Sequence, residues 1–313
     1  MQKSIVVVGS LNLDLVAGVS RLPSLGETII GRDFNTYCGG KGANQAVALA
    51  RLGAPVKMIG KLGSDGFATQ LREGLVKAGV DASCVANAPG SSGTALITTS
   101  ADGDNTIVVI PGANGLLLPE DIDRYREQIE QATIVLAQLE IPSETTKYLG
   151  RMLRSAGIPF ILDPAPAAPL SSGLLRSVTW LTPNETEARL PLEKNFPGLP
   201  VDSPPDAANG LLSLGARNVI LKLGARGVYL AGDDVESAYV SSFPVHAVDT
   251  TAAGDAFNGA FAFALACRGM APRDAAEFAC GVAALSVTRP GAQTSMPTLA
   301  EADAFLLEQD VPR

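Results

Sequence analysis

The segment IVVVG at residues 5–9 is a fully apolar run of strand length, typical of a strand buried on both faces of a parallel sheet. Similar runs recur through the first two-thirds of the 313-residue chain, and segments with apolar residues at helical spacing separate them. This alternation of strand and helix predicts a doubly wound α/β sheet. The further strands are expected at residues 56–59, 134–139, 158–162, 178–181 and 219–223.

The helical segments change character along the chain. In the final third, residues 253–268 and 272–287 form two long Ala-rich helical patterns, and residues 298–308 form a third. Before them, the helices alternate with the predicted strands. These earlier helices are expected at residues 42–52, 65–78, 119–131, 143–156 and 206–214.

Two pairs of short, β-branched segments break the alternation. Residues 13–19 and 28–37 form the first pair; residues 94–99 and 106–110 form the second, on either side of ADGD at 101–104, a hairpin turn signal. We expect these segments to build a small antiparallel sheet that acts as a lid over one edge of the main body. The predicted lid comprises residues 12–40 and 93–111, and the predicted α/β body comprises residues 1–11, 41–92 and 112–313.

The composition limits the kinds of partner. The chain has 24 Lys and Arg against 32 Asp and Glu, and the net charge of −8 argues against binding a nucleic-acid polymer. Backbone N–H groups can still bind a small anion such as a phosphate. No run of 18 apolar residues is present, so no membrane-spanning segment is expected.

The cysteines and the histidine narrow the choice further. The 4 cysteines are widely spaced and form no C-x-x-C pair, which predicts reduced thiols and a cytoplasmic protein. The beginning of the chain, MQKSIVVVG, is expected to enter a first strand rather than to serve as a secretory signal. The single histidine, His246, argues against His-rich metal sites.

The segment DTTAAGDAF at residues 249–257 opens the first long helix of the final third. Free backbone N–H groups gather at such a helix start, and the small residues Ala252, Ala253 and Gly254 let an anion approach them closely. The charge that develops on a transferring phosphoryl group can be held there, and Asp255 can accept the proton of an attacking hydroxyl. The alternative is that Asp255 is only an acidic residue at a helix N-terminus.

The segment GGKGANQA at residues 39–46 also opens a helix, and its paired glycines bring the backbone close to a ligand. Asn44 in this segment offers both a donor and an acceptor. Asn12 and Asp14 follow the first strand and Glu140 follows a later one, so they lie where ligands bind in open α/β sheets. This mixture of groups suits a sugar, although an ordinary glycine turn with helix caps is the alternative.

Two further segments follow predicted strands. Besides a ligand-binding role, TPNETE at residues 182–187 has one alternative interpretation, a helix N-cap. For KLGARG at residues 222–227 the alternative to ligand binding is a plain β-hairpin turn. The Walker A pattern GxxxxGK[ST] and the dinucleotide fingerprint GxGxxG are both absent from the sequence. A P-loop nucleotidase and an NAD-type dehydrogenase are therefore disfavoured.

The segments at 39–46, 182–187 and 249–257, in this order and at these distances, resemble the PfkB family of sugar kinases. The resemblance covers essentially the whole chain, from VGSLNLD at residues 8–14 to GAQ at residues 291–293. It implies a three-layer α/β/α fold with a mostly parallel central sheet and a small antiparallel β lid. It also implies a homodimer formed through the lids.

The activity implied by the resemblance is ATP-dependent phosphorylation of D-ribose at O5. Asp255 would be the general base, and the helix start at residues 252–255 would be the anion hole. Three alternatives stay open within or near the family. The substrate could be another sugar or a nucleoside, such as deoxyribose, a ketose or a sugar acid, or the protein could be a sensor of sugar or nucleotide without catalysis.

The resemblance also implies a role for individual residues. Those that hold the sugar hydroxyls are Asn12, Asp14, Gly39, Gly40, Lys41, Asn44, Glu140 and Asp255. Those at the nucleotide are Asn184, Lys222, Gly224, Gly227, Gly254 and Cys280. Magnesium would be bound through water by Glu187. A potassium ion would be held, largely through carbonyl oxygens, by Asp249, Thr251, Ser286, Arg289, Gly291 and Ser295.

One residue departs from the pattern of the family. Many relatives carry Asn or His beside the adenine, where this chain has Cys280. A thiol is a poor hydrogen-bond partner, so the preference for adenine over other bases stays open.

Overall fold

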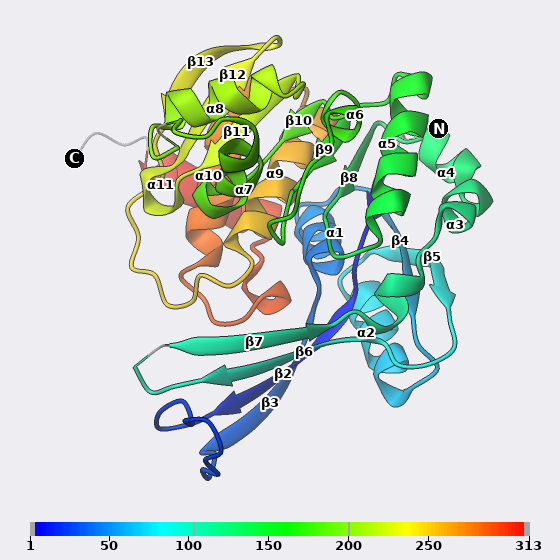
Figure 1. The fold of residues 1–313 in the computed structure, drawn as a ribbon, viewed down its shortest axis with the longest axis vertical. Coiled ribbons are helices and arrows are strands. Elements are labelled where there is room, and N and C mark those ends of the chain that lie inside the picture. Colours follow the sequence, from blue (N-terminus) through cyan, green and yellow to red (C-terminus); the bar gives the residue numbers. More distant parts are fainter. Residues whose placement is uncertain (1–3, 103, 200, 310–313) are drawn as a thin grey trace.

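In the computed structural model, which describes residues 4–102, 104–199 and 201–309, the main sheet has nine strands (Figure 1). Their order is β13-β12-β11-β10-β9-β8-β1-β4-β5; the strands from β11 to β5 run parallel, and β12 and β13 form an antiparallel edge. The strands are β1 (Ile5–Val8), β4 (Val56–Leu62), β5 (Asp81–Asn87), β8 (Ile134–Ala137), β9 (Phe160–Leu162), β10 (Trp180–Leu181), β11 (Asn218–Lys222), β12 (Val228–Gly232) and β13 (Val235–Val240).

The strand β1 lies inside this sheet and is covered on both faces. Ile5 and Val7 belong to one buried apolar cluster, and Val6 and Val8 belong to a second cluster on the opposite face. Successive side chains of a strand point to opposite faces, so a strand covered on both sides must be apolar throughout. Burial on both faces therefore explains the apolar run at residues 5–8. The predicted three-layer α/β/α architecture is confirmed.

The helices divide between the two faces. One cluster contains residues from α1, α2, α9, α10 and α11, and the other contains residues from α3 to α8. No helix among the described residues is long and apolar enough to cross a membrane. The helices are α1 (Lys41–Arg51), α2 (Gly66–Lys77), α3 (Pro119–Arg124), α4 (Arg126–Glu130), α5 (Ser143–Ala156), α6 (Ser172–Leu175), α7 (Glu185–Asn195), α8 (Pro204–Ser213), α9 (Ala253–Cys267), α10 (Pro272–Ser286) and α11 (Leu299–Gln309).

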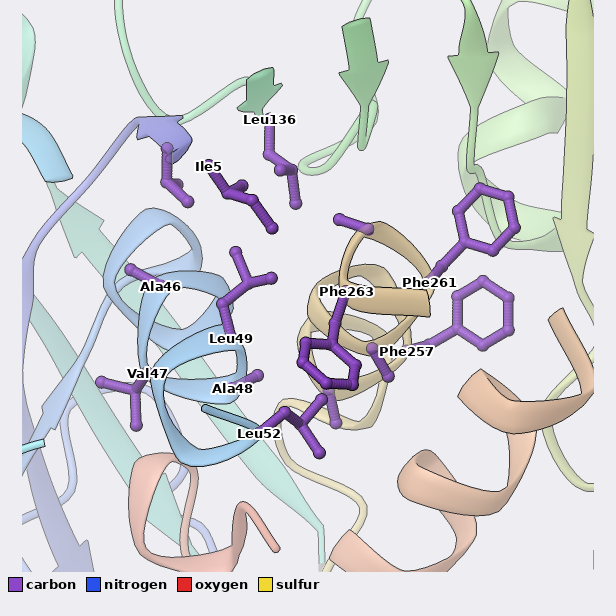
Figure 2. Close-up of a cluster of buried hydrophobic side chains, with 14 of the residues drawn as sticks. Ile5, Ala46, Val47, Ala48, Leu49, Leu52, Leu136, Phe257, Phe261 and Phe263 are labelled. Carbon is purple, nitrogen blue, oxygen red and sulfur yellow. The ribbon is translucent and has the colours of Figure 1, made fainter. Parts of the chain in front are cut away.

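The close approach of α1 and α9 positions the site described below. Figure 2 shows Leu49 on α1 and Phe263 on α9 in one apolar cluster beneath β1 and β8. At the contact, a Cβ on Gly259 would lie only 2.7 Å from the Cβ of Ala48, so the two helices can approach this closely only with glycine there. This packing brings the N-terminal turns of both helices together.

A second, small sheet projects from the body (Figure 1) and has the order β3-β2-β6-β7. The outer pairs are antiparallel as expected, but β2 and β6 run parallel, with Asn12 opposite Gly93. The reason is that the chain crosses the body between these two strands, so both leave it in the same direction. The division into a body and a lid as units stays a prediction. The strands are β2 (Asn12–Gly18), β3 (Asp33–Gly39), β6 (Gly93–Thr99) and β7 (Asn105–Ile110).

The structure corrects several expected elements. The strand expected at 28–37 begins only at Asp33, because its partner β2 ends at Gly18 and offers nothing further to pair with. The helix expected at 119–131 is divided at Tyr125, whose backbone leaves helical geometry with φ −107°. Of the turn at 101–104, Gly103 lies outside the described residues. No range was expected for the strands β5, β12 and β13 or for the helices α6 and α7, although the alternatives at 222–227 and 182–187 imply β12 and α7.

Candidate active site

The start of α9 is shaped to receive an anion. Ala252, which precedes the helix, has a left-handed backbone with φ 59°, so the chain turns sharply into the first helical residue. The N–H groups of Ala252, Gly254 and Asp255 donate no hydrogen bond within the described residues, whereas Ala253 donates to the carbonyl of Thr250 at 3.3 Å. Three free donors at the positive end of a helix dipole form a site for a phosphoryl group.

Asp255 lies beside these donors in the first turn of α9 and is buried. Its Oδ2 accepts a hydrogen bond from Asn44 Nδ2 at 2.9 Å, and its Oδ1 accepts one from Gln45 Nε2 at 3.0 Å. Burial raises the pKa of Asp255 to about 6, although the charge of Lys41 works against the rise. A carboxylate with this pKa is ionised at neutral pH and basic enough to take a proton from a hydroxyl.

Two more carboxylates, Glu140 and Asp14, lie near the start of α1. Glu140 Oε2 accepts hydrogen bonds from the Ser10 hydroxyl at 2.5 Å and from the Lys41 N–H at 3.1 Å. Burial raises the pKa of Asp14 to about 7, and the charges of Glu140 and Asp255 add to the effect. Burial of the Lys41 ammonium works to lower its pKa, but the surrounding carboxylates outweigh it and raise the pKa. The lysine therefore stays charged.

Glycines at 39 and 40 make this gathering possible. A Cβ on Gly39 would lie 2.3 Å from Asp14 Oδ2, and one on Gly40 would lie 2.7 Å from the backbone nitrogen of Asn12. Gly40 also has φ +88°, which side-chain-bearing residues rarely adopt. The paired glycines thus let α1 begin directly against the strand that carries Asn12 and Asp14.

Asn12 is itself held by a neighbour. Asn114 Nδ2 donates to Asn12 Oδ1 at 2.7 Å and to the Leu11 carbonyl at 3.1 Å, and Asn114 Oδ1 accepts from the Leu11 N–H at 2.9 Å. The side-chain oxygen Oδ1 of Asn12 accepts one of these hydrogen bonds. The side-chain NH₂ of Asn12 donates no hydrogen bond within the described part of the chain. It is left as a donor for a ligand.

A cavity of about 610 Å³ begins at Lys41 and Asp255 and extends along α9 and α10. Lys41, Asp163 and Asp255 lie along its polar end. Phe243, Val245 and Val287 belong to its apolar part, which suits a flat aromatic ring. The residues expected at a nucleotide all line this cavity: Asn184, Lys222, Gly224, Gly227, Gly254 and Cys280.

The polar end of the cavity includes a capped helix start. Asn184 Oδ1 accepts from the Glu187 N–H at 2.8 Å, and Glu187 Oε2 accepts from the Asn184 N–H at 2.8 Å, which is a capping box. The alternative interpretation of this segment, an N-cap, therefore describes its local structure. Both residues nevertheless face the cavity, so capping and ligand binding are compatible here.

The alternative interpretation of the segment at 222–227, a β-hairpin turn, likewise describes its local structure. β11 and β12 are an antiparallel pair, and a short 3-10 turn at Gly224–Arg226 joins them. Lys222 at the end of β11 is 3.0 Å from Asp163 Oδ1. Gly224 and Gly227 lie on the wall of the cavity, so this hairpin turn is also part of the candidate nucleotide site.

Of the residues expected at potassium, Ser286 ends α10 and the others lie in two loops tied together next to the start of α9. Asp249 accepts hydrogen bonds from the N–H of Thr251 at 2.9 Å and of Gly291 at 2.8 Å. Burial works to raise the pKa of Asp249, but these donors outweigh it and lower the pKa, so the carboxylate is ionised. The Arg289 side chain turns away to Glu301, with 2.8 Å between Nη2 and Oε1.

Hydroxyl groups in these loops are used locally. The Ser286 hydroxyl donates to the Ala283 carbonyl and the Ser295 hydroxyl donates to the Ala292 carbonyl, each at 2.8 Å. In the described residues, no hydrogen bond ends on the carbonyl oxygens of four of the expected potassium-site positions: Thr251, Arg289, Gly291 and Ser295.

A family model described as pfkB family carbohydrate kinase matches residues 2–299. The chain belongs to the PfkB family of carbohydrate kinases. The ribokinase of Bacillus subtilis is 43% identical over 306 residues, which cover 97% of this chain and 99% of that protein. The deoxyribokinase of Salmonella typhimurium is 38% identical over 310 residues, with 96% and 98% covered.

Solved structures agree with this membership. The ribokinase of Arabidopsis thaliana, solved in complex with ribose and ATP, superimposes with a TM-score of 0.89 at 35% identity. The match covers 98% of this chain and 99% of that one. The PfkB fold and the carbohydrate kinase class predicted from the sequence are therefore confirmed.

The structure places Lys41, Asp255 and the residues expected at the nucleotide on the cavity of this PfkB kinase. Asn12, Asp14, Gly39, Gly40, Asn44 and Glu140 do not line it, although Asn44 contacts Asp255 and Glu140 contacts Lys41. The structure also adds residues that were not expected. Gln45 stands in the quoted segment at 39–46 without an assigned role. Asp163 directly follows the apolar run at 158–162, and a carboxylate at the end of a buried strand was the signal that could have found it. Ser10 and Asn114 carry no comparable signal, because their contacts depend on tertiary packing.

Proposed function

We propose that this PfkB kinase transfers the γ-phosphoryl group of ATP to O5 of D-ribose, forming ribose 5-phosphate and ADP. One observation carries the proposal: Asp255 is fixed between Asn44 and Gln45, next to the unpaired N–H groups at the start of α9. A base and an anion site side by side are what an alcohol acceptor and a phosphoryl donor require.

The reaction is a single displacement at phosphorus. Asp255 takes the proton of the sugar hydroxyl as the oxygen forms its bond to the γ-phosphorus, and the bond from that phosphorus to the bridging oxygen of ADP breaks. The N–H groups of Ala252, Gly254 and Asp255, together with the Lys222 ammonium, offset the negative charge on the transferring group.

The sugar is assigned to the polar cluster at the end of β1. Asp14 and Glu140 offer acceptors, Asn12 and Lys41 offer donors, and Asn44 offers both. Gly39 and Gly40 hold the start of α1 against Asp14 and Asn12. A polyhydroxylated ligand needs this balance of donors and acceptors to replace its hydrogen bonds to water.

Magnesium fits the polar end of the cavity as the companion of the nucleotide. Glu187 faces the cavity beside Asn184, and the described residues contain no group of three or more His, Cys, Asp or Glu that could enclose a metal. Magnesium prefers water and phosphate oxygens to an all-protein cage, so a single carboxylate acting through water fits this ion. When bound, it would neutralise charge on the β- and γ-phosphates.

Potassium fits the two loops around Asp249. The carbonyl oxygens of Thr251, Gly291 and Ser295 are free of hydrogen bonds within the described chain, and the ionised Asp249 supplies a nearby negative charge. A hard monovalent cation prefers such oxygens. The Ser286 carbonyl is less suited, because it accepts the N–H of Arg289 at 3.2 Å.

A homodimer through the small sheet is also part of the proposal. Every residue of β7 is exposed, including the four apolar residues at 107–110, and Phe34 on β3 is 64% exposed. An apolar sheet with two open edges calls for a covering partner, and a second copy of the chain related by a twofold axis is a simple one. Sedimentation at micromolar concentration tests the dimer, and a monomer at that concentration contradicts it.

A cytoplasmic location is supported by the four free cysteines.

The experiment that tests the function is a coupled ADP-release assay with ATP and magnesium, with and without potassium, across ribose, 2-deoxyribose, fructose, gluconate and adenosine. Ribose should give saturable turnover and the largest kcat/KM. The second candidate is 2-deoxyribose, favoured by the similarity to a deoxyribokinase. Ribose binding without release of ADP would instead support a sensor, and slow, unsaturable turnover of ribose would refute the ribose assignment.

A further inference from the structure

Gln45, in the first half of α1, makes three hydrogen bonds inside the protein and is fully buried. Its Nε2 donates to Asp255 Oδ1 at 3.0 Å and to Asp163 Oδ2 at 3.1 Å. Its Oε1 accepts from Gln138 Nε2 at 2.7 Å. Both hydrogens of the amide are therefore committed to carboxylates, and the donor from Gln138 fixes which way the amide faces.

The chain of contacts continues beyond Gln45. Asp163 Oδ1 accepts from Lys222 Nζ at 3.0 Å, and a Cβ on Gly254 would lie 3.2 Å from that same nitrogen. An unbroken series of hydrogen bonds thus runs from Lys222, which faces the nucleotide cavity, through Asp163 and Gln45 to Asp255.

The two carboxylates that Gln45 joins repel each other. Asp163 and Asp255 are both buried, and the charge of Asp163 adds to the rise in the pKa of Asp255 that burial causes. An amide that donates to both offsets part of this repulsion without adding charge. If the amide is removed, Asp255 keeps Asn44 as a donor and Asp163 keeps Lys222, but nothing in the described residues links the two.

We propose that Gln45 is a positioning residue that keeps Asp255 ionised and aimed at the sugar hydroxyl, and that ties it to the lysine at the nucleotide phosphates. The inference rests on the proposed function in one respect, because it takes Asp255 as the general base. It assigns to the segment at 39–46 a task separate from sugar contact: Asn44 and Gln45 hold the two oxygens of one carboxylate.

The charged groups that face Asp255 come from several elements, and each variant below leaves them in place except where stated. They are Lys41 on α1, Asp14 on β2, Glu140 after β8, Asp163 after β9 and Lys222 on β11.

The test is the pH dependence of sugar phosphorylation by Gln45→Met, which keeps the length of the side chain but has no N–H donor. The acid limb of kcat/KM should move up by roughly one pH unit, because an ionised Asp255 has lost a donor. At pH 5 kcat should fall roughly tenfold, the loss should shrink to about twofold at pH 7 and disappear by pH 9, and KM for ATP should stay within about twofold. Gln131→Met, an exposed glutamine on the surface, is the matched control and should leave the profile unchanged.

A second variant with the opposite sign guards against a merely structural effect. Asp163→Asn removes the charge that raises the pKa of Asp255, so its acid limb should move down. Thermal unfolding of both variants shows whether they fold. If Gln45→Met does not fold, Gln138→Met, which removes the donor that fixes the Gln45 amide, replaces it, and an unshifted acid limb there overturns the proposal.

The remaining outcomes are distinct. A uniform loss of kcat at every pH in Gln45→Met, or an unshifted acid limb, overturns the positioning role while the wild-type activity stands. A wild-type protein that phosphorylates none of the sugars instead overturns the proposed function.

Discussion

Lys222 Nζ lies 3.0 Å from Asp163 Oδ1, so the single lysine at the end of β11 is held in place by a buried carboxylate. The same ammonium lies beside Gly254, at the anion site that begins α9. A cation fixed in this way needs no rearrangement to meet a phosphoryl group, and preorganised charge of this kind is a large contribution to catalysis.

Replacing Lys222 with methionine should therefore lower kcat/KM for ATP by roughly 10²-fold, with most of the loss in kcat. Steady-state kinetics at varied ATP measures it. Lys57→Met, which removes a lysine paired with Asp81 away from the site, is the control and should change neither parameter. A loss confined to KM would place Lys222 at ground-state binding only.

Asp255→Asn should reduce turnover by roughly 10³-fold, because the amide cannot take the proton of the sugar hydroxyl. Asn has the size of Asp and still accepts one of the two hydrogen bonds from Asn44 and Gln45, so the sugar site keeps most of its shape. Calorimetric titration with ribose should then give a dissociation constant within about tenfold of the wild-type value. Retained turnover would exclude Asp255 as the base.

The wild-type pH profile should show an acid limb. The pKa of Asp255 is about 6, and only its deprotonated form acts as a base, so kcat/KM should fall about tenfold for each pH unit below that value. The measurement is kcat/KM for the sugar from pH 5 to pH 9 at constant ionic strength. A rate that stays level from pH 8 down to pH 5 would contradict the assigned base.

Asp14→Asn should stabilise the ligand-free protein in a pH-dependent manner. Burial raises the folded-state pKa of Asp14 from 3.8 to about 7, so ionising it costs stability, and the cost grows as the pH rises from about 4 to about 7. The neutral amide removes this cost. The melting temperature should rise at pH 8 and stay nearly unchanged at pH 4, while affinity for the sugar falls; an equal rise at both pH values would refute the linkage.

Ala252→Gly should raise the free energy of unfolding by about 1 kcal/mol, because Ala252 has φ 59° and glycine adopts this conformation without a steric cost. Ala252→Val should destabilise by more than that, since a β-branched side chain fits this region worst. Urea unfolding measures both variants. Activity should persist in the glycine variant, because the N–H groups at the start of α9 remain.

The sequence was sufficient to predict the layers of the fold and the helix start that carries the candidate anion site. Burial on both faces makes a strand such as β1 apolar throughout. Small residues before Asp255 mark a helix start that can bind an anion. Both features are local, so they appear in the sequence itself.

Other features depend on contacts that the sequence does not display. Asp163 and Gln45 are 118 positions apart, and their hydrogen bond exists only because α1 packs beside the end of β9. The strand β13 forms the edge of the sheet and has only one buried residue, so the pattern of buried runs does not extend to it. The strand β12 is buried through residues 228–231 and carries the same signal as the predicted strands. The direction of β6 relative to β2 depends on the route of the chain through the body.

Because β2 and β6 pair in parallel, the distance of a residue from the body increases along both strands together. Both strands leave the body at one line, where Asn12 lies opposite Gly93, and Asn114 fills the space that a Cβ on Gly93 would need. At about 3.3 Å per residue, Asp14 lies roughly 7 Å from this line and Gly18 lies roughly 20 Å from it. A rotation of the small sheet about this line would move Asp14 about a third as far as Gly18, so Asp14, in the proposed sugar site, would shift little while the far end of the sheet moves widely.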